Sequence, residues 1–375
     1  MNKKMQKGCF ILMTVLFISG MLYGQQEADQ FTGLHLNQVQ LIGSHNSYKP
    51  GIEPSLWKII YADDSAAATA LQYGHIGFIE QLNLGLRSLE IDVVYDPHGG
   101  TYKDPLGIHW MKENGITPLP YDTNNDLLKP GLKVFHVPDI DFRSHHLLFV
   151  DCLKELKQWS VMHPGHLPVV ITINTKDSNR KGLHEMLPFT KAAMDSIDLE
   201  IRSVLDPEQL ITPDLIRGDY ATLNKAVLKS GWPLVSEVKG RFFFVLDEVG
   251  EKMETYKAGH PSLAGRVMFV NEKPGSPEAG FMILNNAKKD EAEIRQLVKQ
   301  GYLVRTRADS DTKEARINDY STFKAAQKSD AQIITTDYYL PSILFKATYQ
   351  VIFDNGEYIR KNKLSKQIGQ HEKTK

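Results

Sequence analysis

The sequence predicts an α/β fold, a single-domain irregular TIM (β/α)8-type barrel. Short apolar runs typical of strands alternate along the chain with segments of helical periodicity, which is the pattern of parallel α/β proteins rather than of β-sandwiches. Polar residues also fall at or just after the ends of these runs, where a barrel places its active site. These residues are His45, Glu90, Asp92, His136, Asn174, Asp247, Arg307 and Asp337.

An open, doubly wound sheet is the alternative arrangement of such units. It would usually carry a glycine-rich phosphate-binding loop after its first strand, and residues 43–46 (Gly-Ser-His-Asn) do not form one. We therefore expect a closed barrel whose polar strand ends meet at one mouth.

Eight or nine strands are expected, depending on whether residues 281–285 form a strand or an excursion. The continuous apolar run at 167–174 is typical of a parallel strand that is covered on both faces. In chain order, the candidate strands are 39–44, 88–94, 132–136, 167–174, 241–247, 267–271, 281–285, 303–307 and 332–338.

Helical periodicity is found between these strands. The segment 96–131 is rich in Gly, Pro, Asp and Asn and has little periodicity, and so long an irregular insert usually carries function or lines a site. Residues 49–65 are expected to form a polar connection. The expected helices are 66–84, 144–162, 183–205, 222–229, 292–300 and 312–328.

Composition and charge narrow the class of protein. The 375 residues are 42% hydrophobic and 24% charged, which is typical of a globular protein with a large core. A formal net charge of -1 gives no support to nucleic-acid binding, because a phosphate-tracking protein normally has a strong basic excess.

The two ends of the chain differ from its middle. Residues 1–24 begin with three lysines, continue with a short apolar run and end in small and polar residues, a pattern that predicts a secretory signal peptide and an exported, secreted or periplasmic protein. The barrel is expected over 30–350. The basic tail over 355–375 is interpreted as a frayed terminus, with attraction to an anionic membrane surface as the alternative.

The strand-end residues suit phosphodiester cleavage. This reaction needs a base on the attacking oxygen, an acid on the leaving oxygen, and positive charge on the phosphoryl oxygens. His45 and His136 can supply the base and the acid. Asn46, Glu90 and Asp92 offer oxygen ligands of the kind that Ca²⁺ accepts.

The same residues resemble a known family. Residues 44–48 (Ser-His-Asn-Ser-Tyr), 89–92 (Leu-Glu-Ile-Asp) and 135–136 (Phe-His) are similar to successive active-site motifs of the phosphatidylinositol-specific phospholipase C superfamily. Residues 305–309 (Arg-Thr-Arg-Ala-Asp) and 335–338 (Thr-Thr-Asp-Tyr) are more specifically similar to its secreted, calcium-dependent bacterial branch. The ordered set spans roughly residues 38–340.

The resemblance implies roles for individual residues. His45 would be the general base on the inositol 2-hydroxyl, and His136 the general acid on the glycerol oxygen. Asn46, Glu90 and Asp92 match calcium-ligand positions, while the fourth position, commonly glutamate in the family, is Asn174 here. The missing negative charge should weaken Ca²⁺ binding, select a different metal, or leave part of the task to Lys176. Lys176 and Asp247 are interpreted either as contacts to the substrate phosphate and hydroxyls respectively or as residues of the rim of the site.

The resemblance implies a phosphoric diester hydrolase that acts on phosphatidylinositol or a glycosyl-inositol lipid at a membrane surface. Two alternatives remain. A glycerophosphodiester phosphodiesterase shares the barrel, but would normally begin with a His-Arg pair where this chain has His45 and Asn46. A non-catalytic lipid- or carbohydrate-binding barrel is the other, and only Asn174 favours it.

Overall fold

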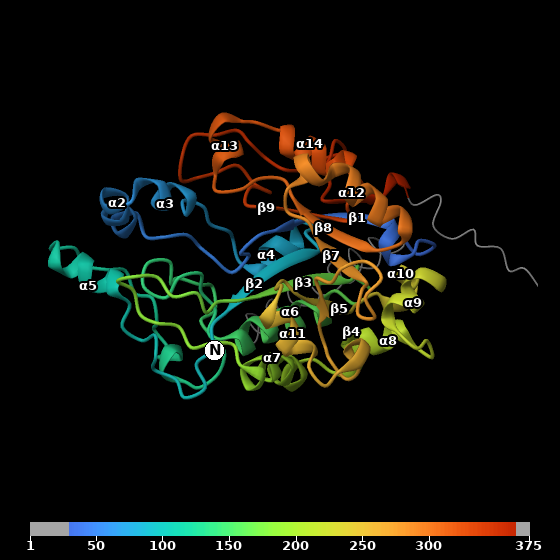
Figure 1. Ribbon diagram of the computed structural model, residues 1–375. Helices are drawn as coiled ribbons and strands as arrows, with labels where there is room; N and C mark the ends of the chain where they lie inside the picture. Colours follow the sequence, from blue (N-terminus) through green and yellow to red (C-terminus); the bar gives the residue numbers. More distant parts are fainter. Residues whose placement is uncertain (1–29, 365–375) are drawn as a thin grey trace, which may run out of the picture.

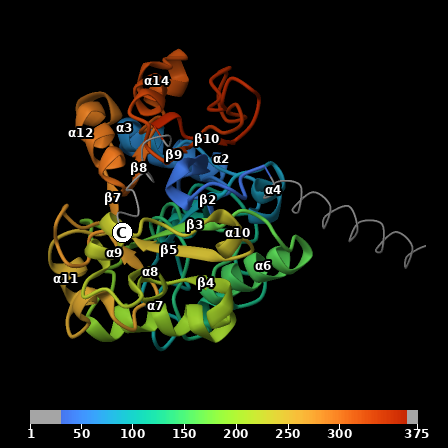
Figure 2. The same ribbon diagram turned by 90° about the vertical axis from the view of Figure 1, so that its right-hand side faces the viewer.

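Eight of the nine candidate strands form a ring in the computed structural model, which describes residues 30–364 (Figures 1 and 2). Every ladder between neighbouring ring strands is parallel, and a single parallel bridge between Asn271 and Phe281 links β6 to β7. The ring strands are β1 (Val39–Ser44), β2 (Ser88–Val93), β3 (Val169–Thr175), β5 (Phe242–Leu246), β6 (Phe269–Val270), β7 (Phe281–Ile283), β8 (Leu303–Arg307) and β9 (Ile333–Thr336). The predicted irregular barrel is confirmed.

The ring closes between β1 and β2 without a strand ladder in the described part of the chain. The first half of β1 pairs instead with the antiparallel strand β10 (Ile359–Lys361). Near the end of β1, Gly43 lies so close to β2 that a Cβ on it would be 2.5 Å from Ser88 Cβ. A close backbone approach at a glycine therefore takes the place of a strand ladder at this seam. Just beyond β1, Ser47 N donates to the Glu90 carbonyl at 2.9 Å and the Ser47 hydroxyl accepts from Glu90 N at 2.8 Å.

Helices surround the ring, with α12 and α14 on one side and α6, α7 and α11 on others (Figure 2). The longer ones bury one apolar face: α12, for example, buries Ile294, Leu297 and Val298 and ends at Gly301, whose φ is 104°. The helices are α2 (Pro54–Asp63), α3 (Ser65–Ala70), α4 (Phe78–Asn83), α5 (Leu106–Glu113), α6 (Phe149–Met162), α7 (Lys191–Val204), α8 (Pro213–Arg217), α9 (Leu223–Lys229), α10 (Val235–Val238), α11 (Glu251–Lys257), α12 (Ala287–Gln300), α13 (Lys313–Ile317) and α14 (Ser321–Lys328).

Shorter elements complete the chain. The two-residue strand β4 (Leu210–Ile211) pairs with the first half of β5, and β6 pairs with its second half. The 3-10 turns are η1 (Leu36–Gln38), η2 (Asp126–Leu128), η3 (Pro207–Gln209) and η4 (Pro261–Leu263).

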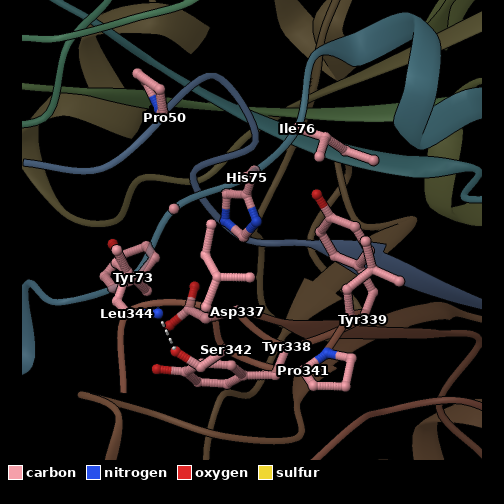
Figure 3. A pocket seen from close by; sticks show the side chains of 13 residues that line it. Pro50, Tyr73, His75, Ile76, Asp337, Tyr338, Tyr339, Pro341, Ser342 and Leu344 are labelled. Carbon is pink, nitrogen blue, oxygen red and sulfur yellow. Dashed lines mark hydrogen bonds between the residues drawn. The ribbon is translucent and has the colours of Figure 1, made fainter. Parts of the chain in front are cut away.

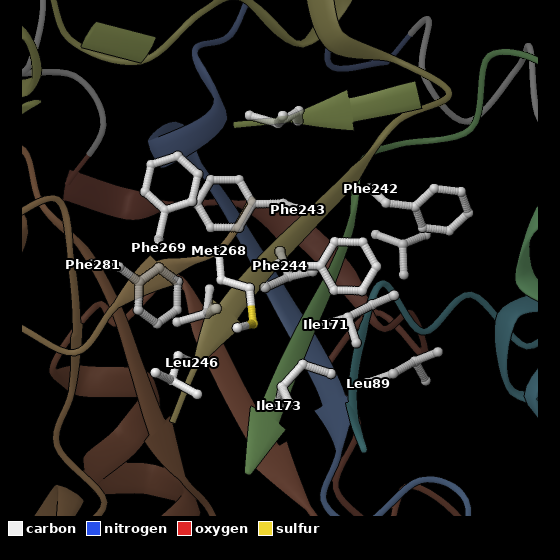
Figure 4. Close-up of a cluster of buried hydrophobic side chains, with 14 of the residues drawn as sticks. Leu89, Ile171, Ile173, Phe242, Phe243, Phe244, Leu246, Met268, Phe269 and Phe281 are labelled. Atoms are coloured by element: carbon white, nitrogen blue, oxygen red, sulfur yellow. The ribbon is translucent and has the colours of Figure 1, made fainter. Parts of the chain in front are cut away.

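Aromatic side chains fill much of the core between β3, β5, β6 and β7 (Figure 4). The rings of Phe243 and Phe269 stack with centroids 4.2 Å apart, and Phe281 lies beside Phe243 at 5.9 Å. Because β5 is buried along its whole length, its continuous apolar sequence is explained by cover on both faces.

One predicted strand is wrong. Residues 132–136 form only isolated bridges, from Lys133 to Val94 and to Leu148. The backbone bonds of 132–134 are divided between Val94 and residues 147–149, so no continuous ladder forms. The fully buried Lys133 ammonium contacts Asp96 and the carbonyls of Lys129 and Gly131. The segment 281–285, left open between strand and excursion, contains the strand β7.

Several helix predictions need correction. The predicted helix 66–84 is interrupted over 71–77, because the chain at Gly74 passes so close to residue 50 that a Cβ would be 2.5 Å from the Pro50 carbonyl oxygen. The expected connection 49–65 contains α2, which begins at Pro54. The insert 96–131 contains α5.

The helices expected over 144–162 and 183–205 begin later, at Phe149 and Lys191. The one expected over 312–328 is divided into α13 and α14 at Asn318, which has a φ of 53°.

The ends of the chain are only partly described. Arg360 and Lys361 pair with β1 in β10, so the interpretation of a frayed end is wrong for these two residues. The predicted signal peptide and residues 365–375 lie outside the described residues. Between residues 30 and 364 no helix combines the length and apolar character that a membrane span requires.

We expect Gly43→Ala to lower the free energy of unfolding by about 1–3 kcal/mol, because its methyl group would overpack the seam against Ser88. Urea unfolding measures the change. Gly33→Ala is the matched control, since nothing lies within 4 Å of a Cβ there. Equal stability of the two variants would contradict this account of the seam.

Candidate active site

The carboxyl ends of the ring strands gather most of the predicted site residues. His45 follows β1, Glu90 and Asp92 lie on β2, Asn174 on β3, and Asp247 directly after β5. Helices α2, α3 and α5 lie at one end of the molecule, opposite α8, α9 and α10 (Figure 1). Because parallel strands end on the same side, residues far apart in sequence meet at one mouth.

Two adjoining hollows open at this mouth. One of about 740 Å³ is lined by His45, His136, Tyr73, Arg180, Arg307 and Asp337, among others. The other, of about 680 Å³, is lined by His136, Asn174, Lys176, Arg180, Glu248 and Lys252, among others. Both predicted catalytic histidines therefore face the same hollow.

His45 is held by a buried carboxylate. Its Nδ1 lies 2.8 Å from Asp337 Oδ1, and the Asp337 side chain is only 1% exposed. Its Nε2 lies 3.3 Å from Nη1 of Arg307 and 3.6 Å from Oε1 of Glu90. The bond to Asp337 fixes the imidazole orientation and turns Nε2 toward Arg307 and Glu90.

The environment keeps His45 uncharged. Burial, and then the positive charge of Arg307, hold the pKa of His45 well below its ordinary value. Beneath it, burial raises the pKa of Asp337. Burial and the Asp337 charge raise the pKa of the neighbouring Asp309 to about 7. A neutral imidazole can accept a proton at neutral pH.

His136, which does not lie on a strand, is also held through Nδ1 by a buried carboxylate. Its Nδ1 lies 3.0 Å from Oδ2 of Asp141, a fully buried carboxylate that also pairs with the ammonium group of Lys49. Burial acts to raise the pKa of Asp141, but the charges and hydrogen bonds of Lys49 and His136 together outweigh it, and the pKa is lowered. Asp141 therefore stays ionised beneath the ring.

Asn46 and Asp92 lie side by side. With its amide nitrogen turned toward Asp92, Asn46 donates to both carboxylate oxygens at 3.3 Å and accepts from the Tyr73 hydroxyl at 2.7 Å. Asn46 has a φ of 48°, a left-handed conformation that asparagine tolerates.

Positive side chains contact both β2 carboxylates. Oδ2 of Asp92 accepts from the Tyr48 hydroxyl at 2.8 Å and pairs with Lys176 Nζ at 3.0 Å. The guanidinium of Arg305 pairs with Glu90 and, through Nη1, with Oδ2 of Asp247 at 2.7 Å. Burial acts to lower the pKa of Lys176, but Asp92, Glu90 and Glu248 together outweigh it, and the pKa is raised.

The predicted fourth calcium ligand is adjacent to this cluster. Asn174 pairs in register with Asp92 across β2 and β3. Its amide nitrogen donates to the Asp247 carbonyl at 2.8 Å and to Glu248 Oε1 at 3.3 Å, which leaves its oxygen for another partner. Within residues 30–364, no group of three or more His, Cys, Asp or Glu side chains is arranged to hold a metal.

The donor set fits Ca²⁺ in chemistry, because amide and carboxylate oxygens are its usual ligands. The amide oxygen of Asn174, whose nitrogen already donates to the Asp247 carbonyl and to Glu248, is the observation that supports this fit. A bound ion would compete with Lys176 for Asp92 and with Arg305 for Glu90.

Sequence reasoning missed several site residues. Asp141 lies five residues after His136, and an acidic residue so close to a candidate histidine was the available signal. The buried Lys49 and Tyr73 had no such signal, because only folding brings them to Asp141 and Asn46. Arg305 lies on a strand, where its sequence position alone did not show that it faces the barrel interior.

An apolar hollow of about 580 Å³ adjoins the site (Figure 3). Tyr73 and Asp337 line both this hollow and the one that contains His45. Its rim includes Ile343, which is 96% exposed, and Leu340, which is 36% exposed. Apolar surface therefore continues directly from the polar site to the outside.

Comparison with known proteins identifies one family. Residues 34–363 match the family model for Ca²⁺-dependent phosphoinositide phospholipase C. No curated protein matches the chain.

Solved structures share the fold. A calcium-dependent phosphoinositol-specific phospholipase C from Pseudomonas sp., in a myoinositol complex, has a TM-score of 0.53 at 14% identity, covering 89% of this chain and 99% of that one. A Ca²⁺-dependent phosphatidylinositol-specific phospholipase C from Streptomyces antibioticus has a TM-score of 0.52 at 17% identity, covering 85% and 99%.

His75 should make stability pH-dependent. It is 7% exposed, its Nε2 donates to the His45 carbonyl at 2.7 Å, and burial lowers its pKa from 6.5 to about 4. Below pH 6.5 the unfolded chain binds a proton that the folded chain refuses until about pH 4. Stability is therefore lost as pH falls through this window, by about 3 kcal/mol in all.

Urea unfolding at several pH values checks this. His75→Gln keeps a donor for the His45 carbonyl but does not titrate, so its acid loss should be smaller by about 3 kcal/mol. The exposed His109→Gln is the control. An unchanged acid loss in His75→Gln would contradict the assignment.

Proposed function

The chain belongs to the Ca²⁺-dependent phosphoinositide phospholipase C family, a family of phosphodiesterases, and from this premise we propose its reaction. It cleaves the glycerol–phosphate bond of phosphatidylinositol or a glycosyl-inositol lipid, with His45 and His136 as base and acid and with a Ca²⁺ ion. The observation that carries this proposal is the pair of imidazoles, each bonded through Nδ1 to a buried aspartate, that face one hollow.

The two histidines divide the proton transfers. His45 Nε2 takes the proton of the inositol 2-hydroxyl as that oxygen attacks phosphorus. The bond from phosphorus to the glycerol oxygen breaks, and His136 Nε2 gives this oxygen a proton. The products are a cyclic inositol phosphate and diacylglycerol. The low pKa of His45 supports its role, because the base must be neutral before the reaction.

Negative charge that develops on the phosphoryl oxygens needs stabilisation. The guanidinium of Arg307, within 3.3 Å of the His45 ring, supplies positive charge on the same wall of the hollow. Ca²⁺, when bound, would polarise the phosphoryl and hydroxyl oxygens as a Lewis acid. Asn46, Glu90, Asp92 and Asn174 would hold it.

Charge balance explains why this chain should bind Ca²⁺ weakly. Glu90 and Asp92 carry the negative charges of the ligand set, and Arg305 and Lys176 already neutralise them. Asn174 adds an oxygen but no charge. Lys176 therefore acts mainly on Asp92 and reaches the substrate phosphate only if it leaves that carboxylate.

Asp247 remains the proposed acceptor for substrate hydroxyls. Its side chain is 17% exposed, and Arg305 holds one of its oxygens. Export by the predicted signal peptide and action at a membrane surface are further parts of the proposal. The exposed Ile343 at the rim of the adjoining apolar hollow supports contact with lipid.

We expect the mature protein to release water-soluble inositol phosphate from phosphatidylinositol vesicles. His45→Ala and His136→Ala should each lower the rate by about 10²–10⁴, because each removes one proton-transfer group. Chromatography of the soluble products measures the cyclic phosphate.

The exposed His109→Ala is the matched control and should retain full activity. Cleavage of glycerophosphodiesters in place of phosphatidylinositol would show that the protein is a glycerophosphodiester phosphodiesterase. Lipid binding with no cleavage of either substrate would indicate a non-catalytic module.

Lys176→Met should raise the affinity for Ca²⁺ by about tenfold or more. It removes a positive charge beside Asp92, and two unit charges about 4 Å apart interact by about 1–4 kcal/mol. Isothermal titration calorimetry with Ca²⁺ measures this without an activity assay. Asn174→Glu should also raise the affinity for Ca²⁺. Lys181→Met, on the exposed surface, should leave that affinity unchanged.

Activity in the presence of a chelator tests whether the reaction needs Ca²⁺. Full wild-type activity in chelator, together with no Ca²⁺ binding by Lys176→Met, would show that Lys176 and Arg305 supply the positive charge and that the proposed metal ligands are wrong.

A further inference from the structure

Residues 176–190 connect β3 to α7 without a helix or strand, and many hydrogen bonds nevertheless fix their course. The strongest anchor is the fully buried Asp139, which accepts from the backbone N of His184 at 2.6 Å and from its Nδ1 at 2.7 Å. Further anchors are Met186 N to Asn179 Oδ1, Leu187 N to the Tyr102 hydroxyl, and Phe189 N to Asp177 Oδ2. The loop is therefore held in one position at the mouth of the barrel.

This loop places Arg180 between the two polar hollows. Among the lining residues of the hollow with His45 and of the hollow with Lys176, only His136 and Arg180 belong to both. In a phosphodiester, the phosphate is the group that joins two organic parts. The junction of the hollows, beside the proposed acid His136, is therefore where the phosphate of a bound diester should lie.

The other Lys and Arg side chains that line these hollows form ion pairs with carboxylates, and in the described part of the chain Arg180 does not. Lys176 pairs with Asp92, Lys252 with Glu248, and Arg307 with Asp337. Arg180 has no carboxylate partner anywhere in residues 30–364, and it is exposed. Its guanidinium charge is thus available for an anion from outside.

We propose that Arg180 binds the phosphate of the substrate and holds it at the junction beside His136. This inference rests on the proposed phosphodiesterase function and adds a phosphate-binding residue to it. A guanidinium can donate two parallel N–H groups to the two non-bridging oxygens of a phosphodiester, which a lysine ammonium cannot match in geometry. The anchored loop limits the conformational entropy that would be lost on binding.

The test compares Arg180→Gln, Arg180→Lys and the neighbouring Lys181→Gln, which lines neither hollow. With phosphatidylinositol vesicles, Arg180→Gln should lower kcat/KM by about 10–100-fold, the range of a charge-assisted hydrogen bond. Arg180→Lys should recover part of this loss. Lys181→Gln should stay within about twofold of the wild type.

A binding measurement separates this inference from the proposed function. Calorimetry with myo-inositol 1-phosphate should show affinity about 10–100-fold weaker for Arg180→Gln than for Lys181→Gln. If the wild type cleaves phosphatidylinositol and Arg180→Gln matches it in both measurements, the role of Arg180 is wrong and the function stands. If the wild type does not cleave it but the binding difference is found, the function is wrong and the phosphate site stands.

Discussion

A buried guanidinium holds the mouth of this barrel together. Arg305 on β8 is 1% exposed, and it pairs with Glu90 on β2 and with Asp247 after β5. Breaking a buried pair leaves an uncompensated charge, which costs about 3–5 kcal/mol. The interaction therefore fixes three strands relative to one another and sets the positions of two carboxylates of the proposed site.

The two histidines also depend on buried charges that are paired. Asp337 and Asp141 are buried, and each is balanced by a cation, Arg307 or Lys49, and contacts the Nδ1 of the imidazole that it orients. Burial thus gives the site two properties at once: fixed ring orientation and, for His45, a lowered pKa. A fixed ring positions the histidine for proton transfer, and a neutral His45 can accept a proton.

Local signals were sufficient for most of the barrel. Runs such as 167–174 and 241–247 are apolar over the length of a buried strand, and the structure confirms strands there. Predictions failed where a distant contact overrode the local pattern. Residues 132–136 are apolar enough for a strand, but their backbone bonds are divided between Val94 and residues 147–149, so no ladder forms. The helix expected over 66–84 breaks where Gly74 meets Pro50.

The sequence by itself determined the barrel class and the resemblance to the phospholipase family, and the family match confirms that resemblance. It also identified the side chains that the strand ends bring to the mouth, because parallel strands place their carboxyl ends together. Only the tertiary structure decided how those side chains pair. Lys176 with Asp92, Arg305 with Glu90, and Lys49 with Asp141 are contacts between segments whose separation in sequence carries no periodic signal. Such pairs form because each buried charge must find a partner, and which partner is nearest depends on the closed ring.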